Sequence, residues 1–270
     1  MNLKHQLIVI SLTALLAASV QAADKKHGSF AAPQKIEPSA GSIWKEHRSG
    51  MEFVWIPGGC FRMGWNEGKK DEIPVHKVCV KGFYLGKYEV TQAQYQKING
   101  NNPSAFPGAD RPVEKASFYD IKSAIDEFNV QTNGQFRLPS EAEWEYACRA
   151  GGDHGEYCGI GGLDKLAWYN DNSGSQTHPV GQKRPNAWGL YDMNGNVGEW
   201  VRDCSHNSYD GAPTDGSAWL GENGGDCGTH VMRGGAWDDD AHGARATNRY
   251  GVAPAKRFSN SGFRLVRTLQ

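Results

Sequence analysis

NAWGLYDMNGNVGEW, at residues 186–200, is the most informative stretch of this chain. It places three large aromatic residues among three glycines and three asparagines. Aromatic side chains bring large apolar surfaces to a core, whereas Gly and Asn allow the left-handed backbone of tight turns. The stretch therefore predicts a buried, irregular loop and not a helix. Its two carboxylates, Asp192 and Glu199, suggest that a hard cation fixes the shape of this loop.

The same composition extends over the whole chain. Its 270 residues include 34 Gly, 9 Trp, 10 Tyr and 10 Phe, although the hydrophobic fraction is only 39%. Long helices would require more Leu and Ala and far less Gly. A chain of this length can bury a sizeable core without other support. We therefore expect short strands and loops that are held together by aromatic clusters.

The first 22 residues have the features of a signal peptide. Lys4 gives a short positive segment, residues 7–18 are mostly apolar, and VQA at 20–22 suits cleavage. The apolar run is too short for a comfortable membrane span, although a retained N-terminal anchor is the alternative. We expect an exported protein, periplasmic or secreted, without stable membrane insertion. Residues 23–50 are polar and aperiodic, which predicts a flexible arm before a domain at 51–268.

The charge pattern argues against two classes of partner. The net charge is −1, and Lys and Arg do not gather in a basic stripe that would suit nucleic acid. The chain also has no polybasic segment that would bind an anionic membrane surface. We therefore expect neither nucleic acid nor a membrane as a partner.

The six cysteines form three pairs that are close in the sequence. An even number of cysteines in an exported protein indicates disulfides. Although six cysteines allow 15 pairings, three loop-closing bridges are the preferred arrangement. In the alternative, two of them form a metal or redox pair, but no CxxC motif supports it. The expected pairs are Cys60 with Cys79, Cys148 with Cys158, and Cys204 with Cys227.

Capping signals predict three helices. Thr91 begins the first, with Gln94 as its capping-box partner, and Ser140 begins the third, with Glu143 as partner. The second is expected over residues 118–128 after Ser117, because apolar residues recur there at helical spacing. Residues 53–64 and 74–86 alternate as strands do. After residue 151 we expect only short strands and loops.

A series of motifs resembles the formylglycine-generating enzyme family, also called the sulfatase-modifying factor family. The resemblance covers residues 51–268 and implies a single α+β domain with the C-type-lectin-like formylglycine-generating-enzyme fold. Such a fold is loop-rich and low in regular secondary structure. The motifs are PGG at 57–59, MG at 63–64, YEVT at 88–91, NPS at 102–104, RPV at 111–113, RLP at 137–139, EYA at 145–147, HPVG at 178–181, the stretch at 186–200, RGG at 233–235 and GFRL at 262–265.

The resemblance implies a structural calcium ion in the loop at 186–200. By that likeness Asp192 and Glu199 give side-chain oxygens, and Gly195 and Val197 give backbone carbonyls, which are the donors that calcium prefers. In the alternative, Glu199 only bonds loop amides and Asp192 is a turn residue. A second calcium in the loop YNDNS at 169–173 is a weaker expectation, because such loops are commonly solvated turns.

The chain departs from the family in two places. Gly198 stands where many relatives carry Trp. The namesake enzymes oxidise a cysteine of a sulfatase peptide with O₂ and with copper held by two cysteine thiolates, which suit Cu(I). The matching positions here are Asp239 and Ala244, and no cysteine follows Cys227. The likeness therefore points to a copper-less exported branch, which includes a pyoverdine-maturation protein. The chain also lacks the HxxxHxE histidines of the ergothioneine-synthase branch, and any redox metal stays unknown.

The segment WDDDAH at 237–242 lies where the family places its active site. Asp239, His242 and Arg245 are the candidate catalytic residues, because carboxylates and imidazole can bind a divalent metal or act as acid and base. Two alternatives remain open. The segment could be a solvated acidic loop paired with Arg245 and Arg249, or the two arginines could present a face for an anionic ligand.

Several functions follow from these residues. The first is oxidative maturation, in which the partner is a secreted peptide, a siderophore precursor or another exported ligand. The alternative is a non-catalytic, lectin-like binding module, since function belongs to the site and not to the fold. A sulfatase-modifying, formylglycine-generating oxidase is a second alternative.

Overall fold

The computed structural model describes residues 37–152, 155–221 and 227–268. The expected signal peptide at 1–22 lies outside these ranges, as does the arm up to residue 36. The strands are β1 (Ile43–Lys45), β2 (Glu52–Ile56), β3 (Gly59–Met63), β4 (His76–Val80), β5 (Phe83–Gly86), β6 (Phe136–Arg137), β7 (Gly198–Cys204), β8 (His230–Arg233), β9 (Arg249–Val252), β10 (Ser261–Gly262) and β11 (Val266–Arg267). The helices are η1 (Lys70–Glu72), α1 (Gln92–Asn99), α2 (Phe118–Thr132), α3 (Glu141–Cys148) and α4 (Leu163–Leu166). Within the described ranges, no helix has the length and apolar character needed to cross a membrane.

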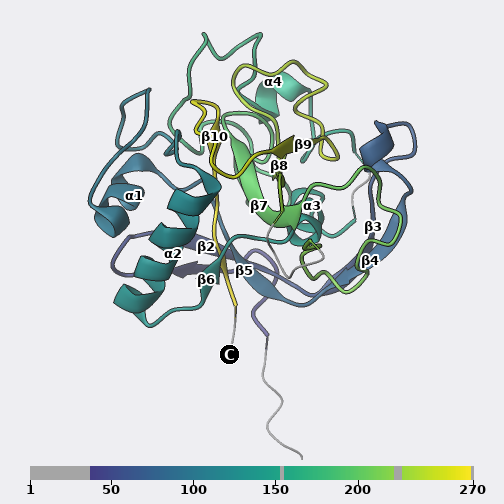
Figure 1. Cartoon of the computed structure of the whole chain (residues 1–270), viewed down its shortest axis with the longest axis horizontal. Coiled ribbons are helices and arrows are strands. Elements are labelled where there is room, and N and C mark those ends of the chain that lie inside the picture. Colours follow the sequence, from purple (N-terminus) through teal and green to yellow (C-terminus); the bar gives the residue numbers. More distant parts are fainter. Residues whose placement is uncertain (1–36, 153–154, 222–226, 269–270) are drawn as a thin grey trace, which may run out of the picture. The chain divides into compact units, whose positions relative to one another are not determined.

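The strands form three sheets (Figure 1). One antiparallel sheet has the order β1-β2-β5-β11-β6, and a second has the order β10-β7-β8-β9, in which β10 runs parallel to β7. The hairpin β3-β4 is the third. In Figure 1, α1 and α2 lie on one side of the β7–β9 strands and the hairpin lies on the other. Short elements joined by long loops confirm the predicted α+β, loop-rich fold.

The ordered domain begins before Met51. Strand β1 pairs with β2, so that Ile43 lies opposite Val54. The amide of Gly41 also donates to the carbonyl of Trp55, at 3.0 Å. The end predicted for the arm, at residue 50, therefore lies too late in the chain, because residues 43–45 already form a strand. Three strand residues within a polar stretch are too few to give a periodicity that the sequence could reveal.

The predicted caps are present in all three helices. Thr91, Ser117 and Ser140 each accept a hydrogen bond from the backbone three residues on, in complete capping boxes. Helix α2 continues to Thr132, beyond the predicted end at 128, and stops where Asn133 turns left-handed at φ 49°. Asn tolerates that conformation and ends helices in this way.

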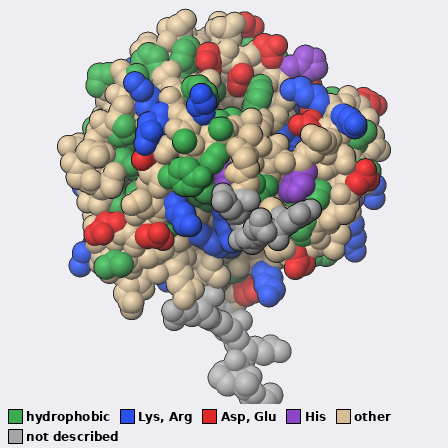
Figure 2. All heavy atoms as spheres, viewed as in Figure 1, with side chains coloured by type: hydrophobic (Ala, Val, Ile, Leu, Met, Phe, Trp, Pro, Cys, Tyr) green, Lys and Arg blue, Asp and Glu red, His purple; other side chains and the backbone are tan. Residues whose placement is uncertain are grey.

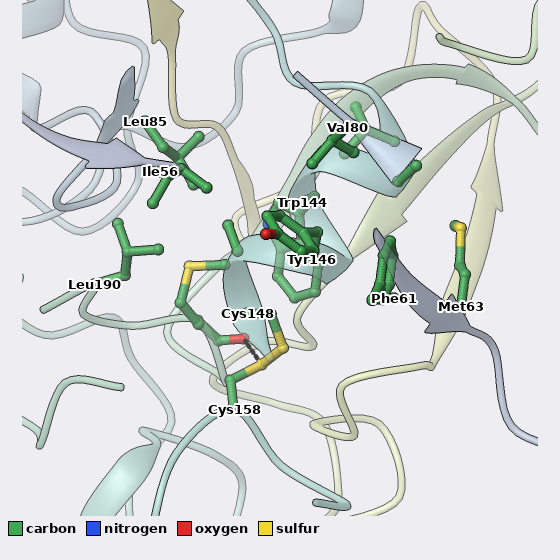
Figure 3. Close-up of a cluster of buried hydrophobic side chains, with 14 of the residues drawn as sticks. Ile56, Phe61, Met63, Val80, Leu85, Trp144, Tyr146, Cys148, Cys158 and Leu190 are labelled. Atoms are coloured by element: carbon green, nitrogen blue, oxygen red, sulfur yellow. Dashed lines mark hydrogen bonds between the residues drawn. A yellow bond between two sulfur atoms is a disulfide. The ribbon is translucent and has the colours of Figure 1, made fainter. Parts of the chain in front are cut away.

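Helix α3 lies inside the core. All eight of its residues are buried, as expected for a helix that protein surrounds on every side. Trp144 is 0% exposed, and Tyr146 packs against Phe61 of β3 with ring centroids 5.3 Å apart. Figure 3 shows these side chains in one apolar cluster that joins the β3-β4 hairpin to the rest of the domain.

The three disulfides have the pairing expected from the order of the cysteines. Cys60 and Cys79 occupy directly paired positions of β3 and β4. Cys148, at the end of α3, joins Cys158 at the edge of the apolar cluster (Figure 3). Cys204, at the end of β7, joins Cys227. All six sulfur atoms are therefore in disulfides.

Candidate functional site

The loop at 186–200 is buried and irregular, as predicted. Asp192, Gly195 and Asn196 have left-handed backbones with φ of 53°, 71° and 61°. A side chain at Gly195 would collide with the backbone of Trp168. The loop is held by Glu89, whose carboxylate accepts from the Asn196 side chain at 2.6 Å and from the Val197 amide at 3.0 Å. This role of Glu89 was not predicted, because Glu89 lies 108 residues before Val197.

Two of the predicted calcium ligands have very different surroundings. One oxygen of Asp192 accepts from the Gly181 amide at 2.7 Å, while the other is buried without any hydrogen-bond partner. Both carboxylate oxygens of Glu199, by contrast, have hydrogen-bond partners. Its carboxylate binds the Arg264 guanidinium at 2.6–2.9 Å and accepts from the Trp144 indole at 2.8 Å. The open acceptor at Asp192 suits a cation, whereas Arg264 already neutralises Glu199.

Negative charge exceeds positive charge around this loop. Burial and the Asp192 and Glu199 carboxylates raise the pKa of Glu89 well above its usual value. Burial also raises the pKa of Asp192 to about 6, against the lowering effect of the Gly181 amide and Arg264. In the described ranges, no group of three His, Cys, Asp or Glu side chains is arranged to hold a metal. A cation here would therefore depend on Asp192 together with backbone oxygens.

The weaker calcium candidate, at 169–173, has the bonds of a turn. The side-chain oxygen of Asn172 accepts from the Tyr169 amide at 3.0 Å, and its amide group donates to the Ala167 carbonyl at 3.0 Å. These local side-chain bonds to the backbone fix the turn from within.

Asp239 lies in a polar pair at the predicted catalytic segment. Its carboxylate accepts from the Ala236 amide at 2.9 Å and from the Tyr250 hydroxyl at 3.3 Å. Burial and the neighbouring Asp238 raise the pKa of Asp239. Burial and Asp239 in turn raise the pKa of the Tyr250 phenol. The pair can therefore hold a proton and offer a hydrogen bond to a ligand.

The other two candidate catalytic residues lie apart from this pair. The His242 side chain is exposed. Arg245 is 2% exposed and binds both oxygens of Glu72, at 2.6 and 2.8 Å. Arg249 likewise binds both oxygens of Glu141, at 2.6 and 2.8 Å. In the described ranges, no hydrogen bond or ion pair joins the side chains of Asp239, His242 and Arg245, although Nε of Arg245 donates to the His242 carbonyl at 3.1 Å. The guanidinium groups of Arg245 and Arg249 form their ion pairs with Glu72 and Glu141 and not with the acidic segment. They turn inward because buried glutamates compensate them there.

A pocket of about 200 Å³ opens beside Asp239. Met232, Val252 and Phe258 give it apolar walls, while Asp239 and Tyr250 give it polar groups. Its further lining residues are Gly198, Gly235, Ala236 and Asn260. Larger pockets of about 320 and 360 Å³ lie elsewhere, but neither includes Asp239 or the residues around it.

Gly198 leaves room for this pocket. A Cβ atom built on Gly198 would lie 3.0 Å from the terminal methyl of Met232, on the pocket wall. A large side chain at this position would therefore enter the pocket. Tyr250 was missed by the sequence analysis, because only the register of β8 with β9, which pairs Met232 with Tyr250, brings it to this wall.

Comparisons with known proteins identify the family of this chain. The sulfatase-modifying factor enzyme 1-like domain matches residues 39–269. The chain is 33% identical to chaperone protein LppX of Paenibacillus barcinonensis over 201 residues, which are 55% of this chain and 70% of that protein. It is 28% identical to a formylglycine-generating enzyme of Mycobacterium tuberculosis over 220 residues, 56% of this chain and 73% of the enzyme. The serine/threonine-protein kinase Pkn1 of Chlamydia trachomatis is 29% identical across 81% of this chain, but the chain spans only 38% of the kinase.

Two solved structures share the fold. PvdO from Pseudomonas aeruginosa has 33% identity and a TM-score of 0.78, over 86% of this chain and all (100%) of that one. Variable protein 1 of Treponema denticola has 28% identity and a TM-score of 0.72, over 83% of this chain and 98% of that one. Together with the domain match, these likenesses show that the chain belongs to the sulfatase-modifying factor family, whose members include formylglycine-generating enzymes.

Proposed function

We propose that this protein is an exported factor that acts in the oxidative maturation of a secreted peptide or siderophore precursor. The pocket beside Asp239 is its binding site. The observation that carries the proposal is the Asp239–Tyr250 pair at the wall of a pocket, on the segment that matches the family's active site. The similarity to PvdO supports a maturation role.

The pocket defines the class of ligand. Its apolar walls suit an aromatic or aliphatic body, and the Asp239 carboxylate suits a hydroxyl or ammonium group. The Tyr250 hydroxyl, which donates to Asp239, can instead donate its hydrogen bond to the ligand, or it can donate to both. Asp239 then orients the donor group and can take up its proton. We infer that Gly198 adapts the family's site to such a ligand by leaving the wall open.

Copper bound by thiolates does not belong to this proposal. By the resemblance, Asp239 and Ala244 match the positions of the family's two copper cysteines, and Ala244 is 0% exposed. The six cysteine sulfurs are all in disulfides. Soft thiolate ligands for Cu(I) are therefore not offered at this site.

Export is supported by the disulfides, because three such bonds fit an oxidising compartment. It is also supported by the apolar N-terminal segment of the sequence. Periplasm or secretion outside the cell would satisfy both observations.

A calcium ion is part of the proposal as a structural cofactor of the loop at 186–200. Support comes from the unpartnered buried oxygen of Asp192 and from the excess of carboxylates around Arg264. The ion would bind Asp192 and carbonyls such as those of Gly195 and Val197. It would leave Glu199 with Arg264.

The test uses the full chain with candidate siderophore precursors and secreted peptides. Oxygen uptake and product mass are measured together with ligand binding by calorimetry. We expect Asp239→Asn and Tyr250→Phe to lose turnover at an unchanged melting temperature. Gly198→Trp should abolish binding by filling the pocket, whereas Gly198→Ala should retain it. The matched control is Asp240→Asn, because Asp240 is an exposed neighbour outside the pocket lining.

The proposal fails if a substrate is oxidised equally well by wild type, Asp239→Asn and Gly198→Trp. Binding that needs the pocket but proceeds without oxygen uptake would instead establish the lectin-like binding module. One observation favours that alternative. The pocket gathers a single carboxyl–phenol pair, while His242 and Arg245 lie outside it.

A further inference from the structure

A histidine contacts one of the three disulfides. The Nε2 atom of His230 lies 3.4 Å from Sγ of Cys227, which is bonded to Cys204. Its Nδ1 atom lies 3.2 Å from the Arg202 carbonyl oxygen. Because a carbonyl oxygen can only accept, Nδ1 carries the hydrogen of the neutral ring. The neutral ring therefore turns the lone pair of Nε2 toward the disulfide.

Two neighbouring strands hold this arrangement in place. His230 begins β8 and is paired across the sheet with Cys204, the last residue of β7. The imidazole is 4% exposed and stacks on the Phe118 ring, with centroids 3.8 Å apart and planes 17° apart. The stack and the Arg202 carbonyl fix both the plane and the rotation of the ring. Such fixed orientation is what a proton-transferring histidine requires.

A pocket of about 360 Å³ lies against the same histidine. Phe118, Leu138 and Leu220 give it an apolar floor, and Arg202 lies at its rim beside His230. Figure 2 shows hydrophobic side chains adjoining Lys and Arg side chains between α2 and β7. Positive charge near a sulfur favours the thiolate over the thiol. Lys122, Arg137 and Arg202 line this pocket with positive charge and Asp126 with negative charge. The pocket thus offers space for a substrate beside His230, which contacts Sγ of Cys227.

The two sulfurs differ in access. Cys204 is 2% exposed, whereas Cys227 is partly exposed. An incoming thiol would therefore reach Sγ of Cys227 first, close to Nε2 of His230.

We propose that Cys204–Cys227 and His230 form a thiol–disulfide exchange site for thiol-bearing peptides or small thiols. A substrate thiol gives its proton to Nε2 of His230, and its thiolate attacks Sγ of Cys227. A bond forms between the substrate sulfur and Cys227, the Cys227–Cys204 bond breaks, and Cys204 leaves with the electron pair as a thiolate. A second substrate thiol gives its proton to the Cys204 thiolate and attacks the substrate sulfur of the mixed disulfide, and Cys227 leaves as a thiolate beside the imidazolium. Two thiols are oxidised to one disulfide, the protein disulfide is reduced to a dithiol, and the two protons stay on the protein.

The decisive property is the acidity of Cys227 in the reduced protein. The full chain is treated with reduced glutathione, and the released thiols are alkylated with iodoacetamide between pH 5.5 and 9. The label on each cysteine is followed by peptide mass spectrometry. An ordinary thiol gives a midpoint of about 8.5, whereas a thiolate paired with a histidine gives one below about 7.5. We expect Cys227 to show the lower midpoint, and Cys60, on an exposed disulfide, the ordinary one.

The substitution His230→Gln tests whether His230 causes the low midpoint expected for Cys227. It should move the Cys227 midpoint up to that of Cys60 and slow glutathione reduction of Cys204–Cys227 at pH 6.5 about fivefold or more, since leaving-group and nucleophile acidity both govern exchange. Reduction of Cys60–Cys79 should not change. The buried Cys148–Cys158 bridge reports on folding, because its exposure would reveal an unfolded variant.

An ordinary midpoint for Cys227 in the wild-type protein would overturn the inference, whatever the variant does. So would equal reduction rates of Cys204–Cys227 in wild type and in a folded His230→Gln protein. Because the site does not include Asp239, these outcomes are independent of the proposed maturation function.

Discussion

Arg245 illustrates how a buried charged residue is held by an ion pair in this fold. Its guanidinium forms two short bonds to Glu72, and Thr247 adds a third at 2.6 Å to the same carboxylate. Although burial alone would raise the pKa of Glu72, Arg245 and Thr247 hold it below its ordinary value. An arginine that compensates a buried carboxylate in this way is not available for catalysis.

The first prediction follows from this pair. Arg245→Ala leaves Glu72 charged and unpaired in the core, so the free energy of unfolding should fall by about 3–5 kcal/mol. Unfolding in urea measures this loss of free energy. The control Arg257→Ala removes a pair whose arginine side chain is 53% exposed, and it should change stability far less. A stable Arg245→Ala protein without activity would restore the catalytic role that the sequence suggested.

Asp192 gives a prediction on pH and calcium. Its folded pKa of about 6 lies above the unfolded value of about 3.9. The folded state therefore binds the proton more tightly. In chelator, this contribution to stability is complete below about pH 4 and is lost as the pH rises through about 6, with an upper limit of about 3 kcal/mol.

Asp192→Asn should therefore stabilise the protein in chelator at pH 7.5 and remove its share of the pH dependence. With calcium present the order should reverse, because only the carboxylate binds the ion. Thermal melting of both proteins, with calcium and with EDTA, measures the effect. A wild-type melting temperature that does not respond to EDTA would refute the calcium site.

At the scale of the elements, helix α3 links the site to the core. Its Ser140 cap accepts from the Glu143 amide at 3.1 Å and also donates to the Gly216 carbonyl at 2.8 Å. Its Glu141 and Glu145 bind Arg233, which is 0% exposed and stands at the start of the RGG motif. The helix thus holds both the hairpin and the strand that leads into the pocket wall.

The third prediction concerns this cap. Ser140→Ala should lower the free energy of unfolding by about 1–2 kcal/mol, because it removes a cap and a tertiary bond. Ser117→Ala in α2 removes a cap and the local bond that the Ser117 hydroxyl donates to the Asp120 carboxylate at 2.6 Å, and it should cost about 1 kcal/mol. Denaturant unfolding compares the two variants. Equal losses would show that the bond to Gly216 contributes no more than the local bond from Ser117 to Asp120.

The elements were predictable where their signals are local. The caps at Thr91, Ser117 and Ser140 depend on residues three positions apart, and the sequence displays them directly. The site depends on distant residues. Glu72 meets Arg245 across 173 residues, and Tyr250 meets Asp239 only through the register of β8 and β9. No periodicity or motif predicts such long-range contacts, so the roles of Glu89 and Tyr250 were not predicted from the sequence.

At the scale of the whole molecule, short elements are held by buried ion pairs and by three disulfides. Three fully buried arginines, Arg233, Arg245 and Arg264, each bind glutamates that lie far away in the sequence. Removing one partner of such a pair is costly, so the scaffold around the pocket is fixed. In the function proposed above, a fixed scaffold would leave the lining residues, above all Gly198 and Asp239, to set the chemistry of the pocket.

The central claim is that this family member works through the Asp239 pocket and without thiolate-bound copper. The most direct measurement supplies the purified protein with Cu(I), then determines bound copper and the conversion of a cysteine-containing sulfatase peptide to the aldehyde. We expect no stoichiometric copper after gel filtration and no aldehyde product. One copper per chain together with aldehyde formation would contradict it.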